Sequence, residues 1–464
     1  MPAIASPKGA AISLLSKEKR DCFGKHPPRK DDLTLFLDRI HKQIIMGIKI
    51  RIILFALGLL VCAYGFIFAE ENPDVLTLDR CFSLAAKVSD DLMIQGERQA
   101  QARQRVKEYK GNILPAVGYN FVKTDMDSAG GRYPVDYNDS YFSVNQPLFY
   151  GLRDFQAYRQ AKNQVTTEGY VYENVERDLR SQTANAFYSL VLVNADIDNL
   201  RSSEKILENR ITELTERVRL GKSRDSEILM VQSQIAGLKA QEESDNGLRA
   251  NAVEDLAFLT GLQPSSISVK DDMPAVNSLE PIEVYLNSGK RRSDIEAAES
   301  DVVSEKYSLD IANGARLPTL NLLAYWYTHR DTAYPGSNWD TFITLNFPLF
   351  QGGSLNAKIV EETSRLKEYD HRLSLVTRQT ISEIRKLYQQ AISSIKQSVA
   401  YQDAYDKAAK SCKMQLQDYR YGLVSNLAAL ESISSMLDAK RNLDRALIQA
   451  KVDKILLEIA ASKQ

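Results

Sequence analysis

The sequence predicts an α+β membrane protein that is internally duplicated and whose few β-strands are pooled between copies of the chain. Residues 152–220 hold a single glycine and no proline, and residues 354–421 hold neither. At about 1.5 Å per residue, helices of this length span about 100 Å, whereas helices of globular proteins average about 11–12 residues. Four shorter segments alternate between apolar and polar residues, and their length suits tilted strands that cross a membrane.

Composition excludes several classes of protein. The 464 residues are 44% hydrophobic and 26% charged, with a formal net charge of -1. A balanced charge gives no basic footprint for nucleic acid. With 14 prolines and 22 glycines, the chain is neither collagen-like nor broadly disordered.

The long apolar run of the sequence lies in residues 46–69. Lys49 and Arg51 precede the run and polar residues follow it, a pattern typical of a signal peptide. A transmembrane anchor is the alternative, because about 20 apolar residues can cross a bilayer. Since a signal peptide lies at the amino terminus, residues 1–45 are interpreted as a mis-called upstream extension.

The chain repeats itself at a nearly constant interval, which is the first thing to seek in a long sequence. We therefore predict two structural repeats, residues 70–262 and 283–464, joined by a proline-containing linker at 263–282. The repeated segments are Leu114-Pro115 with Leu317-Pro318, Pro147-Leu148-Phe149 with Pro348-Leu349-Phe350, and Arg219-Leu220-Gly221 with Arg420-Tyr421-Gly422.

Each repeat is predicted to contain a helical stretch, a strand pair and a long helical hairpin. Apolar residues recur at steps of three and four along the hairpins, which indicates packing against neighbouring helices. The predicted helical stretches are 77–112 and 283–314, and the predicted strand pairs are 116–124 with 140–149 and 319–328 with 339–350.

One face of the predicted strands is apolar and the other is polar. This alternation is expected where lipid lies on one side of a strand and water on the other. The alternative is a pair of small hairpins that pack on a soluble core. The predicted lipid-facing residues are Phe142, Val144, Ile343, Leu345 and Phe347.

Two tryptophans, Trp326 and Trp339, flank the second strand pair and are the only ones in the chain. Aromatic residues at the ends of membrane strands commonly form a girdle at the lipid–water interface. We therefore predict that these two side chains belong to an aromatic girdle.

Four strands cannot close a barrel alone. Open sheet edges do not occur in hydrocarbon, because their N–H and C=O groups find no water there, and the smallest single-chain barrels have about eight strands. Two copies would pool eight strands and three would pool twelve. A barrel of about eight strands is filled by side chains, so a conduit favours three copies, although the spacing alone does not decide this.

Several short segments follow one another in a characteristic order. They are Leu76-Thr77-Leu78-Asp79, Leu114-Pro115, Pro147-Leu148-Phe149-Tyr150-Gly151, Arg292-Ser293-Asp294-Ile295-Glu296-Ala297-Ala298-Glu299, Pro348-Leu349-Phe350-Gln351-Gly352-Gly353 and Tyr419-Arg420-Tyr421-Gly422-Leu423-Val424-Ser425. In this order they resemble the TolC family of outer-membrane efflux and secretion ducts over residues 75–460. Ser293 departs from the family, which often has proline at this position.

The resemblance implies a homotrimer in the cell outer membrane that extends into the periplasm. The implied fold is a long α-helical barrel joined to a transmembrane β-barrel made of pooled strands. The implied function is a passive exit duct for a tripartite efflux pump or a type I secretion system. Its implied partners are a periplasmic adaptor protein and an inner-membrane transporter, and its cargo stays open among drugs, metal ions and proteins.

The resemblance also implies that the turns near Gly221 and Gly422 form the periplasmic tip. The candidate gate residues at the second turn are Tyr419, Arg420 and Gly422. Tyr419 is expected either to lock the closed tip through a hydrogen bond, as the family suggests, or only to pack.

Family members often narrow the tip with acidic side chains just past the second turn. The corresponding positions are Ala428, which departs from this pattern, and Glu431. Three copies of Glu431 around a narrow mouth would favour cations, whereas the alternative is a solvated helix face. Asp225, just past the first turn, has the same two interpretations.

The sequence contains no recognisable catalytic constellation, and we expect no enzyme, cofactor or metal site. His329 and His371 have no cysteine or carboxylate cluster at ligand spacing. Cys81 and Cys412 do not define a disulfide framework, and whether they pair stays open. The main rival is a soluble periplasmic coiled-coil adaptor, which would have one helical hairpin rather than two.

Overall fold

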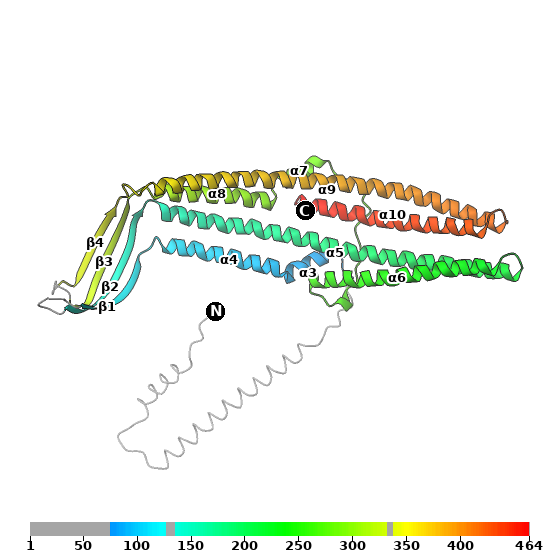
Figure 1. Cartoon of the computed structure of the whole chain (residues 1–464), viewed down its shortest axis with the longest axis horizontal. Helices are drawn as coiled ribbons and strands as arrows, with labels where there is room; N and C mark the ends of the chain where they lie inside the picture. The colour runs from blue at the N-terminus through cyan, green and yellow to red at the C-terminus, as the bar shows by residue number, and fades with distance from the viewer. Residues whose placement is uncertain (1–74, 127–134, 332–336, 464) are drawn as a thin grey trace, which may run out of the picture. The chain divides into compact units, whose positions relative to one another are not determined.

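The computed structural model describes residues 75–126, 135–331 and 337–463 (Figure 1). The predicted signal peptide at 46–69 and the predicted extension at 1–45 lie outside these residues, and both stay predictions. In each half of the described chain, a strand pair stands between a shorter helix and a pair of long helices.

The first half runs from the start of the described residues to a short 3-10 turn. Its elements are α3 (Leu78–Val88), α4 (Asp90–Gly111), β1 (Ala116–Met126), β2 (Val135–Tyr150), α5 (Arg153–Arg219), α6 (Asp225–Thr260) and η1 (Pro264–Ser266). The second half repeats the order. Its elements are α7 (Ile282–Gly289), α8 (Ser293–Gly314), β3 (Thr319–Arg330), β4 (Trp339–Asn346), α9 (Ser354–Arg420) and α10 (Asn426–Ala460).

The two long helices, α5 and α9, have 67 residues each. They lack proline, which would remove a backbone hydrogen bond and clash with the preceding turn. Each hairpin turn contains a glycine with positive φ, Gly221 at +68° and Gly422 at +77°. Such a residue ends a helix without the steric penalty of a Cβ atom.

The helical stretches expected at 77–112 and 283–314 are each divided in two rather than continuous. Ser89 separates α3 from α4 and caps α4 by accepting a hydrogen bond from the backbone N–H of Leu92. Asp90 and Asp91 follow in the first turn, where negative charge is favourable. At the second break, Arg292 has an extended backbone before α8. At Ser89, a strong local N-cap therefore outweighs the helical pattern that runs through it, whereas Arg292 makes no side-chain cap hydrogen bond.

Arg292 is buried and ties the start of α8 to its neighbours. Its guanidinium donates two hydrogen bonds to Asp294, at 2.8 and 2.6 Å. It also bonds Thr380 and Glu383 of α9 and the carbonyl oxygen of Ala460 at the end of α10. Burial alone would raise the pKa of Asp294, but hydrogen bonding and charge from Arg292 outweigh burial and hold that pKa below its usual value.

The strands form one antiparallel sheet in the order β1-β2-β3-β4, at one end of the long helices (Figure 1). Strand β2 begins earlier than expected, at Val135, and passes Pro147 through a register shift. Strand β4 was expected to reach residue 350 but ends at Asn346, ahead of Pro348. Since proline has no N–H to donate, β4 stops before it, whereas a bulge accommodates Pro147.

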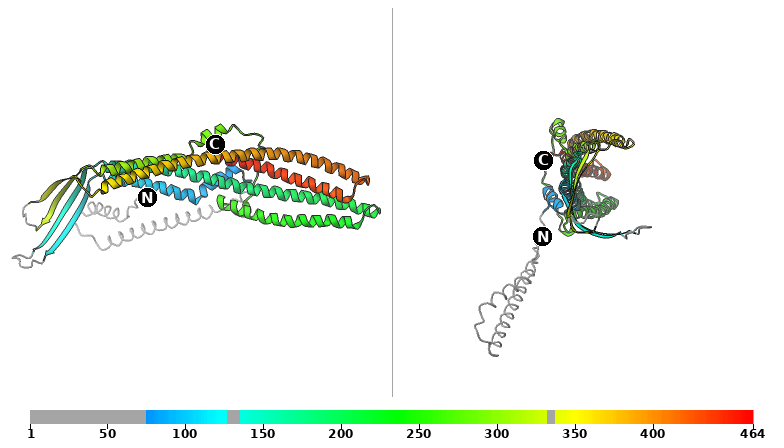
Figure 2. Two further views of the ribbon diagram at one scale, coloured as in Figure 1. Left: turned by 45° about the horizontal axis from the view of Figure 1, so that its top comes forward. Right: turned by 90° about the vertical axis from the view of Figure 1, so that its left-hand side faces the viewer.

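The helices lie side by side, and their lateral order follows the lateral order of the strands that they adjoin (Figures 1 and 2). Near the sheet the order is α4, α5, α8 and α9, and away from the sheet it is α6, α5, α10 and α9. One edge of the described unit is therefore formed by β4 and α9. The other edge is formed by β1, α4 and α6.

Two apolar clusters hold this layer together. The first joins α3, α5, α6 and α10 through Cys81, Phe187, Leu256 and Ile455. The second lies near the hairpin turns and includes Cys412. Cys81 and Cys412 are both free and buried, and burial raises the pKa of Cys81 to about 12.

None of the helices in the described residues carries an apolar stretch long enough to cross a membrane. Within the same residues, no three His, Cys, Asp or Glu side chains are grouped so that they could hold a metal ion.

The sheet and the helices meet where two glycines touch. Gly151 precedes α5 with a φ of +65°, and Gly314 is the last residue of α8. A Cβ atom on either residue would overlap the backbone carbonyl oxygen of the other. This close approach brings the entry of α5 against the exit of α8.

We expect Gly314→Ala to lower the stability of the protein by about 1–3 kcal/mol, because the added methyl group overpacks this contact. Gly111→Ala is the matched control, since Gly111 ends α4 and a Cβ there meets nothing within 4 Å. Thermal unfolding followed by far-ultraviolet circular dichroism measures both. Equal midpoints for the two variants would contradict the close approach.

Candidate functional site

The turns at the far end of the helices from the sheet are built on two glycines (Figure 1). In the second turn, Gly422 donates to the carbonyl of Tyr419 at 3.0 Å and Leu423 donates to that of Asp418 at 2.9 Å. These two bonds define a Schellman motif with glycine at the left-handed position. The predicted tip residue Gly422 thus terminates α9, and Ser425 caps the helix that returns.

Tyr419 connects the two helical hairpins. Its side chain is 5% exposed, and its hydroxyl donates to Glu227 of α6 at 3.2 Å. The hydroxyl of Ser223, in the first turn, donates to the same carboxylate oxygen at 2.6 Å. Tyr419 therefore packs and also makes a hydrogen bond between the hairpins, and its role in locking the closed tip stays a prediction.

Two arginines of α5 lie over the ring of Tyr419. The guanidinium carbons of Arg210 and Arg217 are 3.9 and 4.5 Å from the ring centroid. Arg210 is buried and donates to Glu213 at 2.8 Å and to Asn426 of α10 at 2.7 Å. A desolvated cation over an aromatic face is worth about 2 kcal/mol, so this stack holds α5 and α9 together.

Arg420 lies at the exposed rim of the same group. Its Nε is 3.3 Å from Glu213, and its side chain is 69% exposed. Glu213 therefore bridges Arg420 and the buried Arg210. We call Arg210, Glu213, Glu227, Tyr419 and Asn426 the tip network.

Asp225 stands apart from the tip network. It is the first residue of α6 and is exposed. Within the described residues it makes no ion pair or side-chain hydrogen bond, so its predicted role in the tip stays a prediction.

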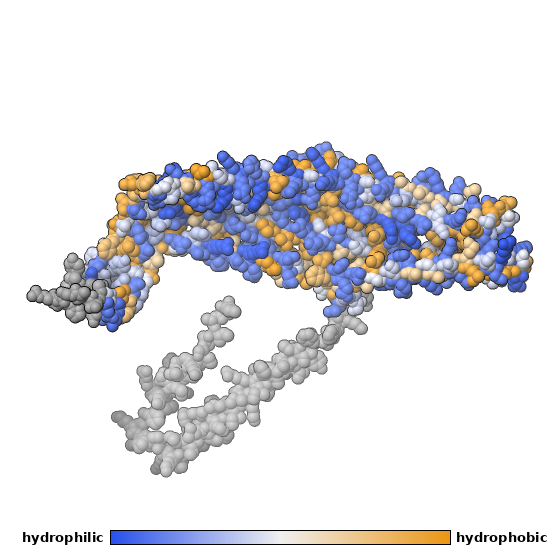
Figure 3. Space-filling view, viewed as in Figure 1, coloured by the Kyte–Doolittle hydropathy of each residue, from blue (hydrophilic) through white to orange (hydrophobic). Residues whose placement is uncertain are grey.

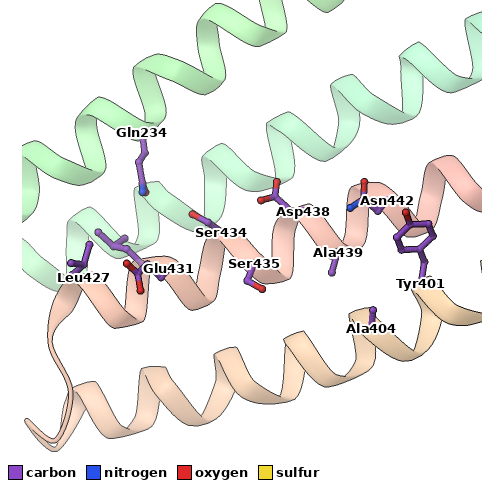
Figure 4. Close-up of a pocket in the computed structure, with 11 residues that line it drawn as sticks. Gln234, Tyr401, Ala404, Leu427, Glu431, Ser434, Ser435, Asp438, Ala439 and Asn442 are labelled. Carbon is purple, nitrogen blue, oxygen red and sulfur yellow. The ribbon is translucent and has the colours of Figure 1, made fainter.

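Glu431 lies in an open groove lined by α6, α9 and α10 (Figure 4). It stands on the face of α10 that also carries Asp438, two turns further along. Gln234 of α6 and Tyr401 of α9 flank this face. Both carboxylates are exposed, so the groove presents two negative charges per copy to solvent.

Sequence reasoning missed the partners of the predicted residues. Asp438 could have been found, because a spacing of seven residues from Glu431 places both on one helix face. Glu227 is 192 residues from Tyr419 in the chain. No local pattern joins two residues so far apart.

The predicted lipid-facing residues share one face of the sheet. Phe142 pairs with Trp326, Trp326 pairs with Trp339, and residues directly opposite in antiparallel strands point to the same side. Val144 opposite Ala324, Ile343 opposite Leu322, and Leu345 opposite Leu320 extend this face.

Phe347 lies just past the end of β4 and is exposed. Apolar residues gather over the part of the sheet nearest the long helices (Figure 3). On the opposite face of the sheet, Asn120 donates to Ser143 at 2.8 Å.

Comparisons with known proteins match this architecture. Residues 285–460 match a family described as outer membrane efflux protein. The chain is 22% identical to the outer membrane protein TolC of Salmonella enteritidis over 423 residues, 87% of this chain and 84% of that protein. It is 24% identical to the alkaline protease secretion protein AprF of Pseudomonas aeruginosa over 403 residues, 80% and 83% of the two chains.

The solved structure of the outer membrane protein VceC of Vibrio cholerae matches with a TM-score of 0.73 at 18% identity, covering 83% of this chain and 95% of that one. The chain thus shares the fold of this outer-membrane protein. Residues 285–460 match the efflux family and most of the chain is similar to TolC, so the comparisons support a TolC-family outer-membrane efflux protein with a transport function.

We expect Tyr419→Phe to loosen the contact between the hairpins, because it removes the donor to Glu227. The loss of one hydrogen bond is worth about 0.5–1.5 kcal/mol, which corresponds to about a two- to tenfold rise in local opening. Hydrogen–deuterium exchange of the first turns of α6 and α10 measures it. Tyr421→Phe is the control, because Tyr421 is 71% exposed; an equal rise in that variant would show that the Tyr419 bond is not responsible.

Proposed function

We propose that this chain is the subunit of a passive exit duct in the outer membrane that serves a tripartite efflux pump or a type I secretion system. The observation that carries the proposal is the pair of open edges. β4 and α9 end the described unit on one side, and β1, α4 and α6 end it on the other. Copies that join head to tail through two different edges form a ring around a central space when the rotation between them closes.

Three copies form this ring in our proposal. β4 of one copy pairs with β1 of the next, and twelve strands close a transmembrane β-barrel that continues into a long α-helical barrel. Closure satisfies the edge N–H and C=O groups, which have no water partner in lipid. Twelve strands also leave a wider lumen than eight strands do, because side chains fill the interior of a barrel of eight.

The shared apolar face of the sheet is the lipid side of this barrel. Phe142, Val144, Ile343, Leu345 and Phe347 then contact lipid tails, and the paired Trp326 and Trp339 belong to the aromatic girdle. Support comes from their common side in the strand register and from the polar pair of Asn120 and Ser143 opposite. Lipid outside and water inside match that difference.

We also propose that residues 70–262 and 283–464 descend from one duplicated unit. Support comes from the repeated order of elements and from the equal length of α5 and α9. Each strand pair is followed by a glycine in the left-handed backbone conformation, Gly151 in one half and Gly353 in the other.

The turns are the proposed docking surface for a periplasmic adaptor protein and, beyond it, an inner-membrane transporter that supplies the energy. Exposed apolar side chains at a turn support a protein contact. Leu220 is 60% exposed in the first turn, and Leu423 is 72% exposed in the second. Asp225 and Gly422 lie beside them in the same turns.

The groove at Glu431 is the proposed cation-preferring part of the duct. Three copies would place three Glu431 and three Asp438 carboxylates along the narrow end, and rings of acidic side chains favour cations. Ala428 supplies no carboxylate. Asp438, one heptad past Glu431, supplies a second ring in its place.

The soluble coiled-coil adaptor is not favoured, because the matched family and relatives are outer-membrane proteins. We expect the protein to fractionate with outer membranes and to require detergent for recovery, since the apolar face of its sheet would otherwise meet water. Recovery as a soluble monomer after osmotic shock would contradict the membrane location.

Single-channel conductance in planar bilayers tests the duct. We expect the wild-type protein to conduct and to prefer cations. Glu431→Gln and Asp438→Asn should each lower the permeability ratio of potassium over chloride, and the double variant should lower it several-fold. Glu283→Gln, which removes a carboxylate on α7, is the control with an unchanged ratio. The absence of any conductance would refute the duct, and an unchanged ratio in the double variant would refute the rings.

A further inference from the structure

Helix α9 has one side that no described element of its own chain covers. Gln390 and Ser394 bond Asp453 of α10 on one side, and α7 packs on Ile384 and Tyr388 on another. The remaining side forms a shallow groove lined by α9 alone, which we call the α9 groove. Its residues are Arg378, Ile381, Ser382, Arg385, Lys386 and Gln389.

The α9 groove is positively charged. Arg385 and Lys386 are exposed, and within the described residues neither has an ion pair. Arg378 bonds only the backbone carbonyl of Ser374, at 3.3 Å. Ile381 supplies an apolar floor between these cations. The groove therefore fits an apolar side chain flanked by carboxylates.

Such a side chain lies on the opposite edge of the same chain. Phe258, near the end of α6, is 85% exposed. Glu254 and Asp255 stand one turn before it, are exposed, and have no ion pair within the described residues. The other face of this turn carries Leu256, which is buried against α5. We call Phe258, Glu254 and Asp255 the Phe258 patch.

The patch and the groove lie at the same height along the helices. Leu256 of α6 and Ile455 of α10 belong to one apolar cluster. Leu457, about half a turn further along α10, belongs to another apolar cluster, which also contains Ile384 of α9. Phe258 is therefore level with the segment of α9 that carries Arg385 and Gln389.

A rotation about a common axis changes the position of each residue around the ring but not its height. In the proposed trimer, the α9 edge of one copy meets the α6 edge of the next, and groove and patch come together without a shift along the axis. This inference rests on the proposed ring of copies, and it names the side chains that join one copy to the next.

We infer that the Phe258 patch of one copy docks in the α9 groove of the next. The phenyl ring covers Ile381 and the aliphatic part of Arg385, while Glu254 and Asp255 face the cations of the groove. A large aromatic side chain surrounded by charge complementarity is the composition of an interface hot spot. The same chain carries both halves, so the partner is a second copy.

Disulfide cross-linking of the full chain tests the inference. We expect the variant with Phe258→Cys and Gln389→Cys to give covalent dimers and trimers on oxidation. The matched control combines Phe258→Cys with Gln390→Cys, because residue 390 lies at the same height but on the side facing α10. Bridged cysteines need Cα atoms within about 7 Å, so the control should stay monomeric on a non-reducing gel.

The outcomes separate the inference from the proposed function. A trimer by light scattering that cross-links at neither position, or equally at both, overturns this interface and leaves the channel in place. A monomer overturns the ring of copies as well. A cross-link to a different protein in whole cells assigns the patch to another partner and also overturns the inference.

A charge exchange gives a second measurement. Arg385→Glu should lower the trimer fraction several-fold at low protein concentration, because it sets like charges against each other across the interface. Adding Glu254→Arg should restore the fraction. If the double exchange remains as poorly assembled as the single one, the two side chains do not face each other.

Discussion

An open β-sheet edge carries a row of N–H and C=O groups, and in hydrocarbon these groups have no partner other than another strand. The four-stranded sheet has two such edges, β1 and β4. An unsatisfied group costs several kcal/mol in lipid, so two bare edges cannot be offset by burial of a few apolar side chains. In the proposed ring, further copies close these edges, and the organisation of the rest of the chain is consistent with that need.

In the proposed ring, the helices of neighbouring copies must also join edge to edge, but they do so in water rather than in lipid. They satisfy their own backbone groups, and the water around them tolerates an exposed edge. Side chains alone then decide what joins α9 to the next α6. The unpaired cations of the α9 groove and the exposed Phe258 answer that requirement. In the proposed ring, strand edges would supply affinity without selectivity, and the helical edges would supply the selectivity for a copy of this chain.

Much of this fold follows from local sequence. The long helices were predictable because proline is absent from them, and their ends because Gly221 and Gly422 adopt a conformation that other residues avoid. Strand alternation likewise identified one apolar face, since a period of two is a local property. The break at Ser89 was missed because a single capping side chain competes with a helical pattern that continues on both sides of it.

The contacts of the candidate site could not be predicted in the same way. Tyr419 was identified through the resemblance to the TolC family, but its partner Glu227 lies on another hairpin. The neighbours of α9 depend on the order in which helices associate, and no periodicity encodes that order. Charge complementarity between Arg385 and Glu254 becomes visible only when the helices are set at their relative heights.

The tip network also limits which contacts could change if the proposed duct opens. Arg210 is 2% exposed at its side chain, and separating such a buried charge from its partners costs about 3–5 kcal/mol. The exposed pair of Arg420 and Glu213 belongs to a class worth about 0–1 kcal/mol. If the proposed duct opens at this end, the rim pair is the less costly contact to break, while the stack of Arg210 on Tyr419 keeps α5 and α9 of the chain together.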